Sequence, residues 1–363
     1  MQEAPPTQVR RVSVSVPIVN TTPIDPLTDL EWDRLVATHP NSTFFHSSAW
    51  ARVLHGTYGH QPFYHRFYRG DQLVAILPTM EVRSAFSGRR GTCLPFTDAC
   101  EPLYFGKEDP APAIMDHLRE IACSRKWKHF EVRGKGANLP GSIPSVRFYN
   151  HILGLRDNPD DLYRQLADPV RRAIKKAEQH GLSAETATDL AAVSAFYRLH
   201  IQTRKRHGLP PQPFSFFRNI YEHVIKARLG FVVLTRRGSC VIAAAVFLHA
   251  GRKAIYKFGA SDVSQQEFRG NNLTMWTAIK TLSERGFETL DLGRTSLANH
   301  GLRRFKQAWG TAEQVVEYSK YDAATQSWVT SQDKVAGFHN KVFRAMPTRL
   351  NRLAGALLYP HLD

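Results

Sequence analysis

The chain has 363 residues, of which 42% are hydrophobic and 11% aromatic, a composition that suits two globular domains of ordinary size. It carries 48 Lys and Arg against 32 Asp and Glu, a net charge of +16. We therefore expect polyanionic partners such as nucleic acid, phosphorylated coenzymes or an anionic lipid surface; the alternative is a basic protein with no such partner.

Cysteine usage and hydropathy exclude several classes of protein. Four cysteines without a CxxC pair argue against a disulfide framework and a cysteine-rich zinc site. The N-terminus lacks the apolar segment of a signal peptide, and no run of 18 apolar residues occurs. We expect a cytoplasmic protein, and a peripheral position at the inner face of the membrane stays open.

The first half of the chain predicts helices, a run of antiparallel strands, a third helix and further strands. Apolar spacing predicts helices over 29–40 and within 42–59. A turn signal at 69–72 predicts a hairpin. Strands are expected at 12–19, 62–69, 72–83, 92–97, 128–134 and 148–155, with an amphipathic helix at 112–127. Residues 22–155 are predicted to form an N-terminal domain.

The second half repeats this order of helices, meander, helix and strand. Residues 230–261 predict three consecutive strands, followed by a strand at 288–293. Helices are expected at 160–182, 189–210, 216–230 and 271–287, and a closing strand pair at 312–322 and 327–330. Residues 156–325 are predicted to form a C-terminal domain.

Residues 326–363 form a basic tail. Between Lys334 and Arg352 there are five Lys and Arg and no acidic residue, and apolar residues recur at helical spacing around Pro347. Two interpretations stay open: a helix pair that packs on the body, or a basic amphipathic segment on an anionic membrane surface through residues 334–352.

Short motifs in a fixed order then indicate a family. They are "VRRAIKKAEQHGL", "YKFGAS" at a strand end, "GNNLTMW" opening a helix, "DLGRT" closing a strand, and "GLRRFKQAWG". Together, over residues 25–325, the chain resembles Fem-type acyltransferases, the family of peptidoglycan interpeptide-bridge aminoacyltransferases with GCN5-related (GNAT) relatives. "TFFHSSAWARVL" and "LVAILPTMEVRS" are similar to the exopolysaccharide-associated branch.

The resemblance implies an α/β (α+β) fold with two tandem GNAT-like domains, central mixed and mostly antiparallel sheets, and a basic helical tail. It implies transfer of an acyl or aminoacyl group from acyl-CoA or aminoacyl-tRNA to an amine, with no permanently bound cofactor or metal. The implied acceptor is a phosphorylated or lipid-linked saccharide or peptide precursor of the cell envelope or exopolysaccharide. The helical arm of some bridge-forming members is missing, and the coenzyme-A pyrophosphate loop appears only as "FRGNNL".

The catalytic candidates lie in the last motifs. Lys306 occupies the position of the family's Phe-Lys pair, where the resemblance implies that the ammonium stabilises the oxyanion of the tetrahedral intermediate. Phe305 and Trp309 flank it as aromatic contacts, and the alternative is a lysine lying over aromatic neighbours. Asp291, or a chain of waters, is expected to take the proton of the amine.

Binding candidates surround this centre. Arg294 follows a strand end, where ligands of open sheets bind, with an ion pair to Asp291 as the alternative. Arg303 and Arg304 add charge, and at least one of them should be solvated. Tyr256 and Lys257 lie where a GNAT sheet splays to admit the donor.

Two helix features complete the predicted site. Gly270, Asn271 and Asn272 open a helix whose N–H groups suit a phosphate or an acyl carbonyl, unless they only cap it. Arg171 and Lys175 lie one turn apart on a basic helix, where a diphosphate would relieve their repulsion, unless the face is simply solvated.

His46 and Trp50 lie one helical turn apart and are candidates for lining the acceptor pocket. The alternative is that Trp50 belongs to the core and that His46 only forms hydrogen bonds within the protein. For the whole chain, the alternative to an enzyme is a non-catalytic RNA-binding or membrane-surface scaffold with a degenerate GNAT fold.

Overall fold

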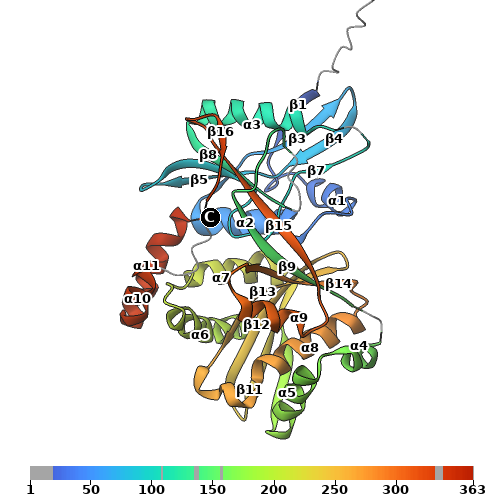
Figure 1. The fold of residues 1–363 in the computed structure, drawn as a ribbon, viewed down its shortest axis with the longest axis vertical. Coiled ribbons are helices and arrows are strands. Elements are labelled where there is room, and N and C mark those ends of the chain that lie inside the picture. The colour runs from blue at the N-terminus through green and yellow to red at the C-terminus, as the bar shows by residue number, and fades with distance from the viewer. Residues whose placement is uncertain (1–18, 108, 135–138, 156–157, 332–337, 363) are drawn as a thin grey trace, which may run out of the picture.

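The computed structural model describes residues 19–107, 109–134, 139–155, 158–331 and 338–362. It shows two α/β halves, one above the other, with the C-terminal helices along one side (Figure 1). The strand expected at 12–19 lies outside the described residues apart from Val19, which begins β1.

The N-terminal half has three helices around two sets of strands. A small sheet in the order β1-β3-β4-β7 packs beside the main one. The helices are α1 (Trp32–Ala37), α2 (Ser48–Tyr58) and α3 (Ala111–Arg125). The strands are β1 (Val19–Ile24), β2 (Gln61–Pro62), β3 (Tyr64–Arg69), β4 (Gln72–Leu77), β5 (Met80–Ser84), β6 (Gly88–Thr92), β7 (Leu103–Tyr104), β8 (Trp127–Gly134) and β9 (Val146–Gly154).

The strand expected at 92–97 is wrong. β6 ends at Thr92, and the chain then turns because Leu94 and Phe96 adopt positive φ angles of 53° and 58°. Such angles are rare for bulky residues and are incompatible with an extended strand. The turn carries the chain to Asp98, which belongs to the site described below.

The C-terminal half builds on three long antiparallel strands and a parallel one. Its helices are α4 (Pro159–Gln165), α5 (Asp168–Gln179), α6 (Leu190–Arg206), α7 (Phe214–Ile220), α8 (Gly270–Glu284) and α9 (His300–Gln307). Its strands are β10 (Leu182–Ala187), β11 (Gly230–Arg237), β12 (Cys240–Ala250), β13 (Lys253–Ser261) and β14 (Thr289–Ser296).

Two helix predictions in this half need correction. The helix expected over 160–182 is two helices, because Pro169 can occupy the first turn of α5 but not a helix interior. The helix expected at 216–230 begins earlier, after Pro213, and passes into a π-helical turn over Tyr221–Ile225. β10 was not predicted at all.

One continuous sheet joins the halves. Its strand order is β10-β11-β12-β13-β14-β9-β15-β8-β6-β5-β2. β15 (Ala312–Asp322) and β16 (Ser327–Val329) were expected to close the second half. Instead β15 of the second half pairs with β8 and β9 of the first half, and β9 pairs with β14 of the second half. Each half therefore contributes a strand to the sheet of the other.

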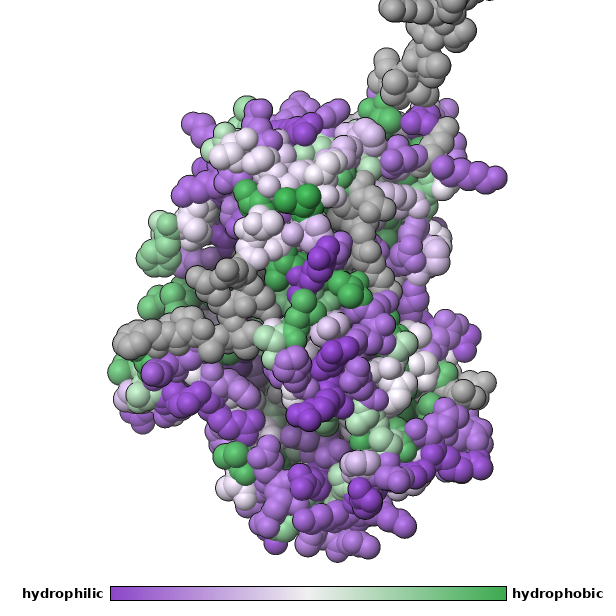
Figure 2. Space-filling view, in the orientation of Figure 1, coloured by the Kyte–Doolittle hydropathy of each residue, from purple (hydrophilic) through white to green (hydrophobic). Residues whose placement is uncertain are grey.

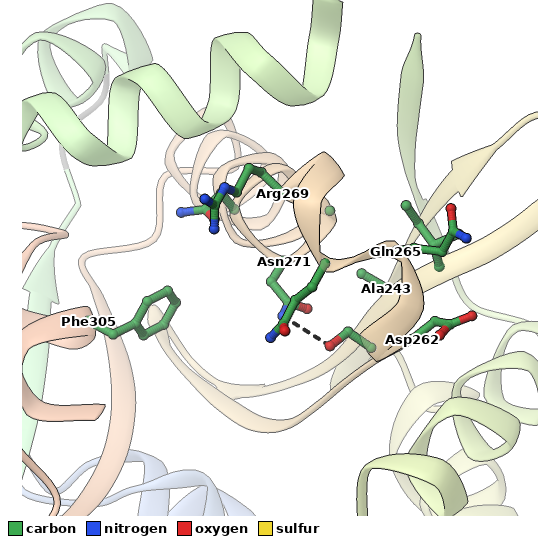
Figure 3. Close-up of a pocket in the computed structure, with 11 residues that line it drawn as sticks. Ala243, Asp262, Gln265, Arg269, Asn271 and Phe305 are labelled. Carbon is green, nitrogen blue, oxygen red and sulfur yellow. Dashed lines mark hydrogen bonds between the residues drawn. The ribbon is translucent and has the colours of Figure 1, made fainter. Parts of the chain in front are cut away.

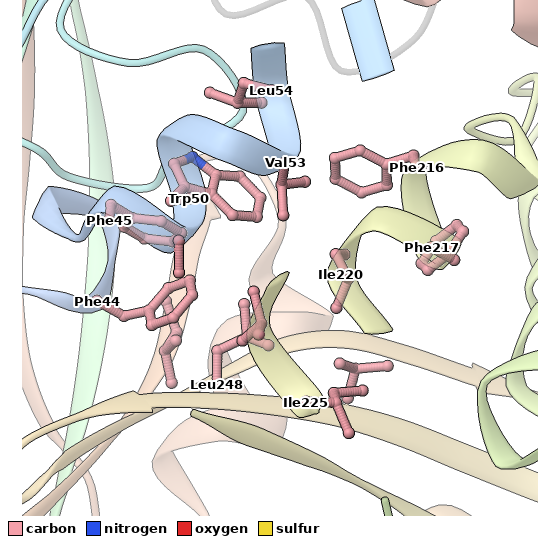
Figure 4. Close-up of a cluster of buried hydrophobic side chains, with 14 of the residues drawn as sticks. Phe44, Phe45, Trp50, Val53, Leu54, Phe216, Phe217, Ile220, Ile225 and Leu248 are labelled. Atoms are coloured by element: carbon pink, nitrogen blue, oxygen red, sulfur yellow. The ribbon is translucent and has the colours of Figure 1, made fainter. Parts of the chain in front are cut away.

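A shared hydrophobic core also joins them. Trp50 and Val53 on α2 face Phe216 and Ile220 on α7 (Figure 4), and all four are buried. Leu248 on β12 closes the same cluster from below. Because burial of each such side chain contributes roughly 1.5–3 kcal/mol, we expect the two halves to fold as one unit.

The tail forms α10 (Phe338–Ala345), α11 (Thr348–Leu358) and a turn over Tyr359–His361. It packs on the body: Gly355 lies so close to the Pro211 carbonyl that a Cβ would come within 1.9 Å of the oxygen. Tyr359 is buried and its hydroxyl accepts from Arg204 at 2.7 Å. Among the described residues, no helix has the length and apolarity that crossing a bilayer requires.

Candidate active site

The site begins where two parallel strands part. β13 and β14 pair only from Lys253 with Thr289 to Ile255 with Asp291. Tyr256 and Lys257, the next two residues, therefore lie at the point where the pairing ends. Lys257 is also the extra residue of a bulge against β12, a feature that redirects side chains in a sheet.

A first cavity of about 200 Å³ lies at the N-terminus of α8; we call it the α8 cavity. Phe305 from α9 faces Asn271 across it (Figure 3). Asn271 donates from Nδ2 to Ser261 Oγ at 3.1 Å, so its side chain is fixed. Gly270 and Asn272 complete the mouth. The Asn272 N–H donates to the Arg269 carbonyl at 3.0 Å, and the positive end of the helix dipole at this position suits an anion.

Gly270 is needed at this position because the wall is tight. A Cβ there would lie 3.2 Å from the Ala243 Cβ and 3.3 Å from Ile242 Cδ1. The helix can therefore start directly against β12. This close approach leaves the space in front of the helix for a ligand.

A second cavity of about 240 Å³ lies between the halves; we call it the junction cavity. Segments from both halves line it, including Glu101 and Asn150 from the first and Asp291 and Gln314 from the second. Lys253 donates to the Pro40 carbonyl at its edge.

Two buried polar atoms of the junction cavity lack partners. Asn150 and Gln314 are opposite each other on β9 and β15. Asn150 donates from Nδ2 to Asp291 Oδ2 at 3.1 Å, but among the described residues nothing donates to its Oδ1 and nothing accepts from Gln314 Nε2. Because unsatisfied buried polar atoms cost about 1–3 kcal/mol each, this wall is suited to a polar ligand.

Lys306 is buried between the two cavities. It is 4% exposed, and its Nζ donates to the carbonyls of Gly293 at 2.7 Å and Arg294 at 3.0 Å. Its third N–H has no acceptor among the described residues. Neither cavity wall includes Lys306 itself, but its neighbour Phe305 lines one and Asp291 lines the other.

A turn at Gly293 in β14 orients the Gly293 and Arg294 carbonyls toward Lys306. The register of β14 against β9 shifts between Asp291 and Arg294, and Gly293 has a φ of 74°. A Cβ at Gly293 would also lie 3.6 Å from the Asp98 carboxylate. The glycine thus permits the left-handed turn, whereas a Cβ at this distance would make only ordinary van der Waals contact with Asp98.

The charges in this region change the protonation behaviour of Lys306 and Asp291. Burial lowers the pKa of Lys306 to about 8, against the opposing effect of Asp98 and Asp291. Burial raises the pKa of Asp291 to about 6, although donors from Asn150 and the Gly293 N–H favour its carboxylate. At neutral pH the first group is mostly a cation and the second mostly an anion.

Asp98 is one of the residues that the sequence analysis missed. Its carboxylate accepts from Lys257 Nζ at 3.0 Å and lies 3.9 Å from Arg294 Nε. Burial alone would raise its pKa, but these cations outweigh burial and the pKa falls below its ordinary value. No local motif marks Asp98, because it enters from the turn after β6 in the other half.

Arg294 lies at the surface of this cluster. Its guanidinium stacks over Phe148 at 4.4 Å and Tyr318 at 5.1 Å, and its ion-pair partner is Asp98, not Asp291. The side chain stays 39% exposed, so its remaining N–H groups can reach a carboxylate or phosphate.

The other predicted site residues are paired within the protein, buried in the core or exposed to solvent. Arg303 forms a two-fold ion pair with Glu313, at 2.7 and 2.6 Å. Arg171 forms an ion pair with Asp168, which lies three residues earlier on α5. Trp309 is 1% exposed in the core, whereas Lys175 and Arg304 are exposed.

Of the two residues proposed for the acceptor pocket, Trp50 lies in the core instead, and His46 lines a cavity but has its own hydrogen-bond partners. Trp50 is buried in the shared core. His46 lines the junction cavity, yet its Nδ1 accepts from the Thr43 N–H and its Nε2 lies 2.9 Å from the Glu101 carbonyl. Burial lowers the pKa of His46 to about 4, so it is neutral at physiological pH.

These features describe an α/β fold whose candidate site lies between two halves, and comparisons with known proteins identify the fold as GNAT-like. Residues 164–307 match the family model described as an acetyltransferase (GNAT) domain. A crystal structure of FemX covers 82% of this chain and 96% of its own, with a TM-score of 0.63 and 16% identity. A tandem GNAT protein from the clavulanic acid biosynthesis pathway covers 84% and 99%, with a TM-score of 0.51 and 12% identity. The predicted fold and the resemblance are confirmed.

Sequence similarity to characterised enzymes is more local. A lipid II:glycine glycyltransferase of Staphylococcus aureus is 32% identical over 85 residues, 21% of this chain. The match spans 20% of that enzyme's length, and the other curated relatives of this name match over the same share.

Proposed function

We propose that the protein is an N-acyltransferase of the Fem/GNAT type. It moves an acyl or aminoacyl group from acyl-CoA or aminoacyl-tRNA to an amine of a cell-envelope or exopolysaccharide precursor. The GNAT domain match, the FemX-like fold and the partial match to a lipid II:glycine glycyltransferase support this class of reaction.

The single observation that carries the proposal is the buried ammonium of Lys306. Two carbonyls hold it at 2.7 and 3.0 Å and one N–H is left over. A lysine that served only packing would turn its charge to solvent, because burying an ammonium is costly. A fixed, partly desolvated cation suits an oxyanion that forms during the reaction.

The reaction then follows from the positions of the charges. The amine nitrogen attacks the carbonyl carbon of the donor, and the C=O electrons become an oxyanion that the Lys306 ammonium stabilises. The amine proton passes to the Asp291 carboxylate, directly or through water. The intermediate collapses as the bond to the thiol sulfur of CoA, or to the ribose oxygen of tRNA, breaks; the leaving group takes up a proton.

The α8 cavity is our candidate for the activated end of the donor. Gly270, Asn271 and Asn272 line it at the start of α8, and the N-terminus of a helix favours a phosphate or carbonyl oxygen. Both CoA and tRNA carry phosphates, and the net charge of +16 favours either. These features support donor binding without distinguishing the two donors.

The acceptor is assigned to the space between the halves. A cavity of about 480 Å³ adjoins the junction cavity, sharing Lys253, Thr43 and neighbouring residues with it. Lys253 and Arg252 line this path together with Asp33 and Glu288, and Arg252 forms an ion pair with Glu288 at 3.2 Å. We infer a phosphorylated or lipid-linked acceptor whose amine reaches Asp291 while its anionic part stays near Lys253.

Purified protein incubated separately with radiolabelled acetyl-CoA and with charged tRNA, each with a mixture of amine acceptors, tests the proposal. We expect one donor to be bound and turned over. Binding of tRNA with neither turnover nor dependence on Lys306, combined with steep loss of binding in salt, would instead support the RNA-binding scaffold. If neither donor binds, the enzyme proposal fails.

A further inference from the structure

We propose that α11 and the tip of the β5–β6 hairpin form a docking surface for an anionic lipid bilayer. This inference does not depend on the transfer reaction. It rests on which side chains of α11 face the body and which face solvent.

The amphipathic pattern of α11 is inverted. The helix packs on the body through Asn351 and Gly355, while its leucines face outward. Leu350, Leu353 and Leu357 are 54%, 56% and 62% exposed. With about 100° per residue, they occupy a stripe roughly 60° wide, opposite the buried residues. An exposed row of leucines on a terminal helix indicates a surface that is covered in use.

A second apolar element lies next to the turn that follows α11. Phe86, at the tip of the β5–β6 hairpin, is 78% exposed, and its ring contacts the ring of His361 at 4.9 Å. Leu362, the next residue, is also exposed. The hairpin and α11 reach the same side of the molecule, where Figure 2 shows hydrophobic atoms at the edge.

The charges around these apolar residues favour an anionic surface. Arg83 and Arg89 are cross-strand partners at the hairpin tip, and both are exposed; Arg83 also forms an ion pair with Glu81 at 2.6 Å. On α11, Arg349 flanks the leucine stripe and is exposed. The described tail, residues 338–362, contains no Asp or Glu. Leucine and phenylalanine flanked by arginine is the composition of helices that lie in the headgroup region of a membrane.

A bilayer fits this surface better than a protein groove. The apolar residues come from two elements that lie far apart in the sequence, and they project outward rather than line a hollow. A protein partner with a matching cavity would not need the exposed arginines beside them, whereas anionic headgroups would neutralise these charges. A second copy of this chain would bring the same arginines together and repel.

Vesicle flotation of the full-length protein tests the inference. We expect binding to vesicles of phosphatidylcholine containing about a third phosphatidylglycerol, weak binding to phosphatidylcholine alone, and loss of binding in high salt. A variant with Leu350→Ser, Leu353→Ser and Leu357→Ser should lose at least roughly tenfold in affinity, because three apolar side chains no longer insert. Phe86→Ser should lose less.

Leu30→Ser is the matched control, because Leu30 is 92% exposed and lies just before α1, which is on the side of the molecule away from α11 (Figure 1). It should bind vesicles like the unchanged protein. Equal binding of the triple variant and the unchanged protein would overturn the inference, as would no binding to either vesicle. A leucine-dependent dimer in light scattering without vesicle binding would also overturn it and assign the stripe to self-association.

Discussion

The α8 cavity and the junction cavity are built in different ways. All but one of the residues around the first come from a single stretch, 242–272, with Phe305 as the exception. The second draws on segments near residues 40, 100, 150, 253, 290 and 314. A site made from one stretch conserves its geometry through local structure, whereas a site made from six depends on the shared sheet and core. The two should therefore respond differently to substitution.

The largest effect is expected at Lys306, because Phe305 beside it lines one cavity and Asp291, whose charge acts on its pKa, lines the other. Lys306→Met keeps the length of the side chain but removes the cation, so the oxyanion loses its stabilising charge. We expect the rate of acyl transfer to fall by about 10²–10³-fold with donor affinity nearly unchanged. Single-turnover assays and equilibrium binding of the donor measure the two quantities.

The control for Lys306→Met is its thermal unfolding, because the substitution also leaves the Gly293 and Arg294 carbonyls without their donor. A folded variant that binds donor but does not react supports the assigned role. A folded variant with more than about a tenth of the original rate contradicts it, since one oxyanion donor contributes roughly 3–4 kcal/mol.

The pH dependence of the rate should be bell-shaped. Asp291 accepts a proton only when ionised, so the rate should rise through about pH 6, where its pKa lies. Lys306 acts only when protonated, so the rate should fall as the pH passes about 8. Rates measured at saturating donor over about five pH units, from about 4.5 to 9.5, cover both the acidic and the basic limb of this profile.

Asp291→Asn should remove the acidic limb and lower the rate by about 10²-fold, the usual contribution of a general base. The same limb should persist in Lys306→Met, which keeps the carboxylate. An acidic limb that survives Asp291→Asn would transfer the role to water or to the acceptor amine itself.

Substitutions in the two walls should separate donor from acceptor. Gln314→Leu removes an unpartnered donor of the junction cavity and should raise the KM for the acceptor by about tenfold, with the donor KM unchanged. Asn271→Leu alters the α8 cavity and should do the reverse. Steady-state kinetics with each substrate varied in turn test this, and equal effects on both KM values would show that the cavities are not separate subsites.

The difference between the cavities also explains what the sequence could predict. Gly270 and Asn271 were found because a helix start leaves a local signature of small and polar residues. Lys306 was found through a motif. Asp98 and Gln314 were not, because they reach the site only through the pairing of β15 with β9 and the turn after β6. Strand exchange between the halves and positive φ at Leu94 leave no periodic signal in the chain.

The smallest effect is expected on α5, outside both walls. Arg171 already pairs with Asp168, but Lys175 is exposed and has no ion-pair partner among the described residues. If the phosphates of the donor extend to this helix, Lys175→Ala should raise the donor KM about two- to threefold at low salt and have no effect at high salt, because an exposed charge is screened. Lys280→Ala, on the exposed part of α8, is the matched control, since Lys280 lies near Glu284. Equal donor KM values for the two variants would confine the donor site to the α8 cavity and leave α5 as a solvated basic face.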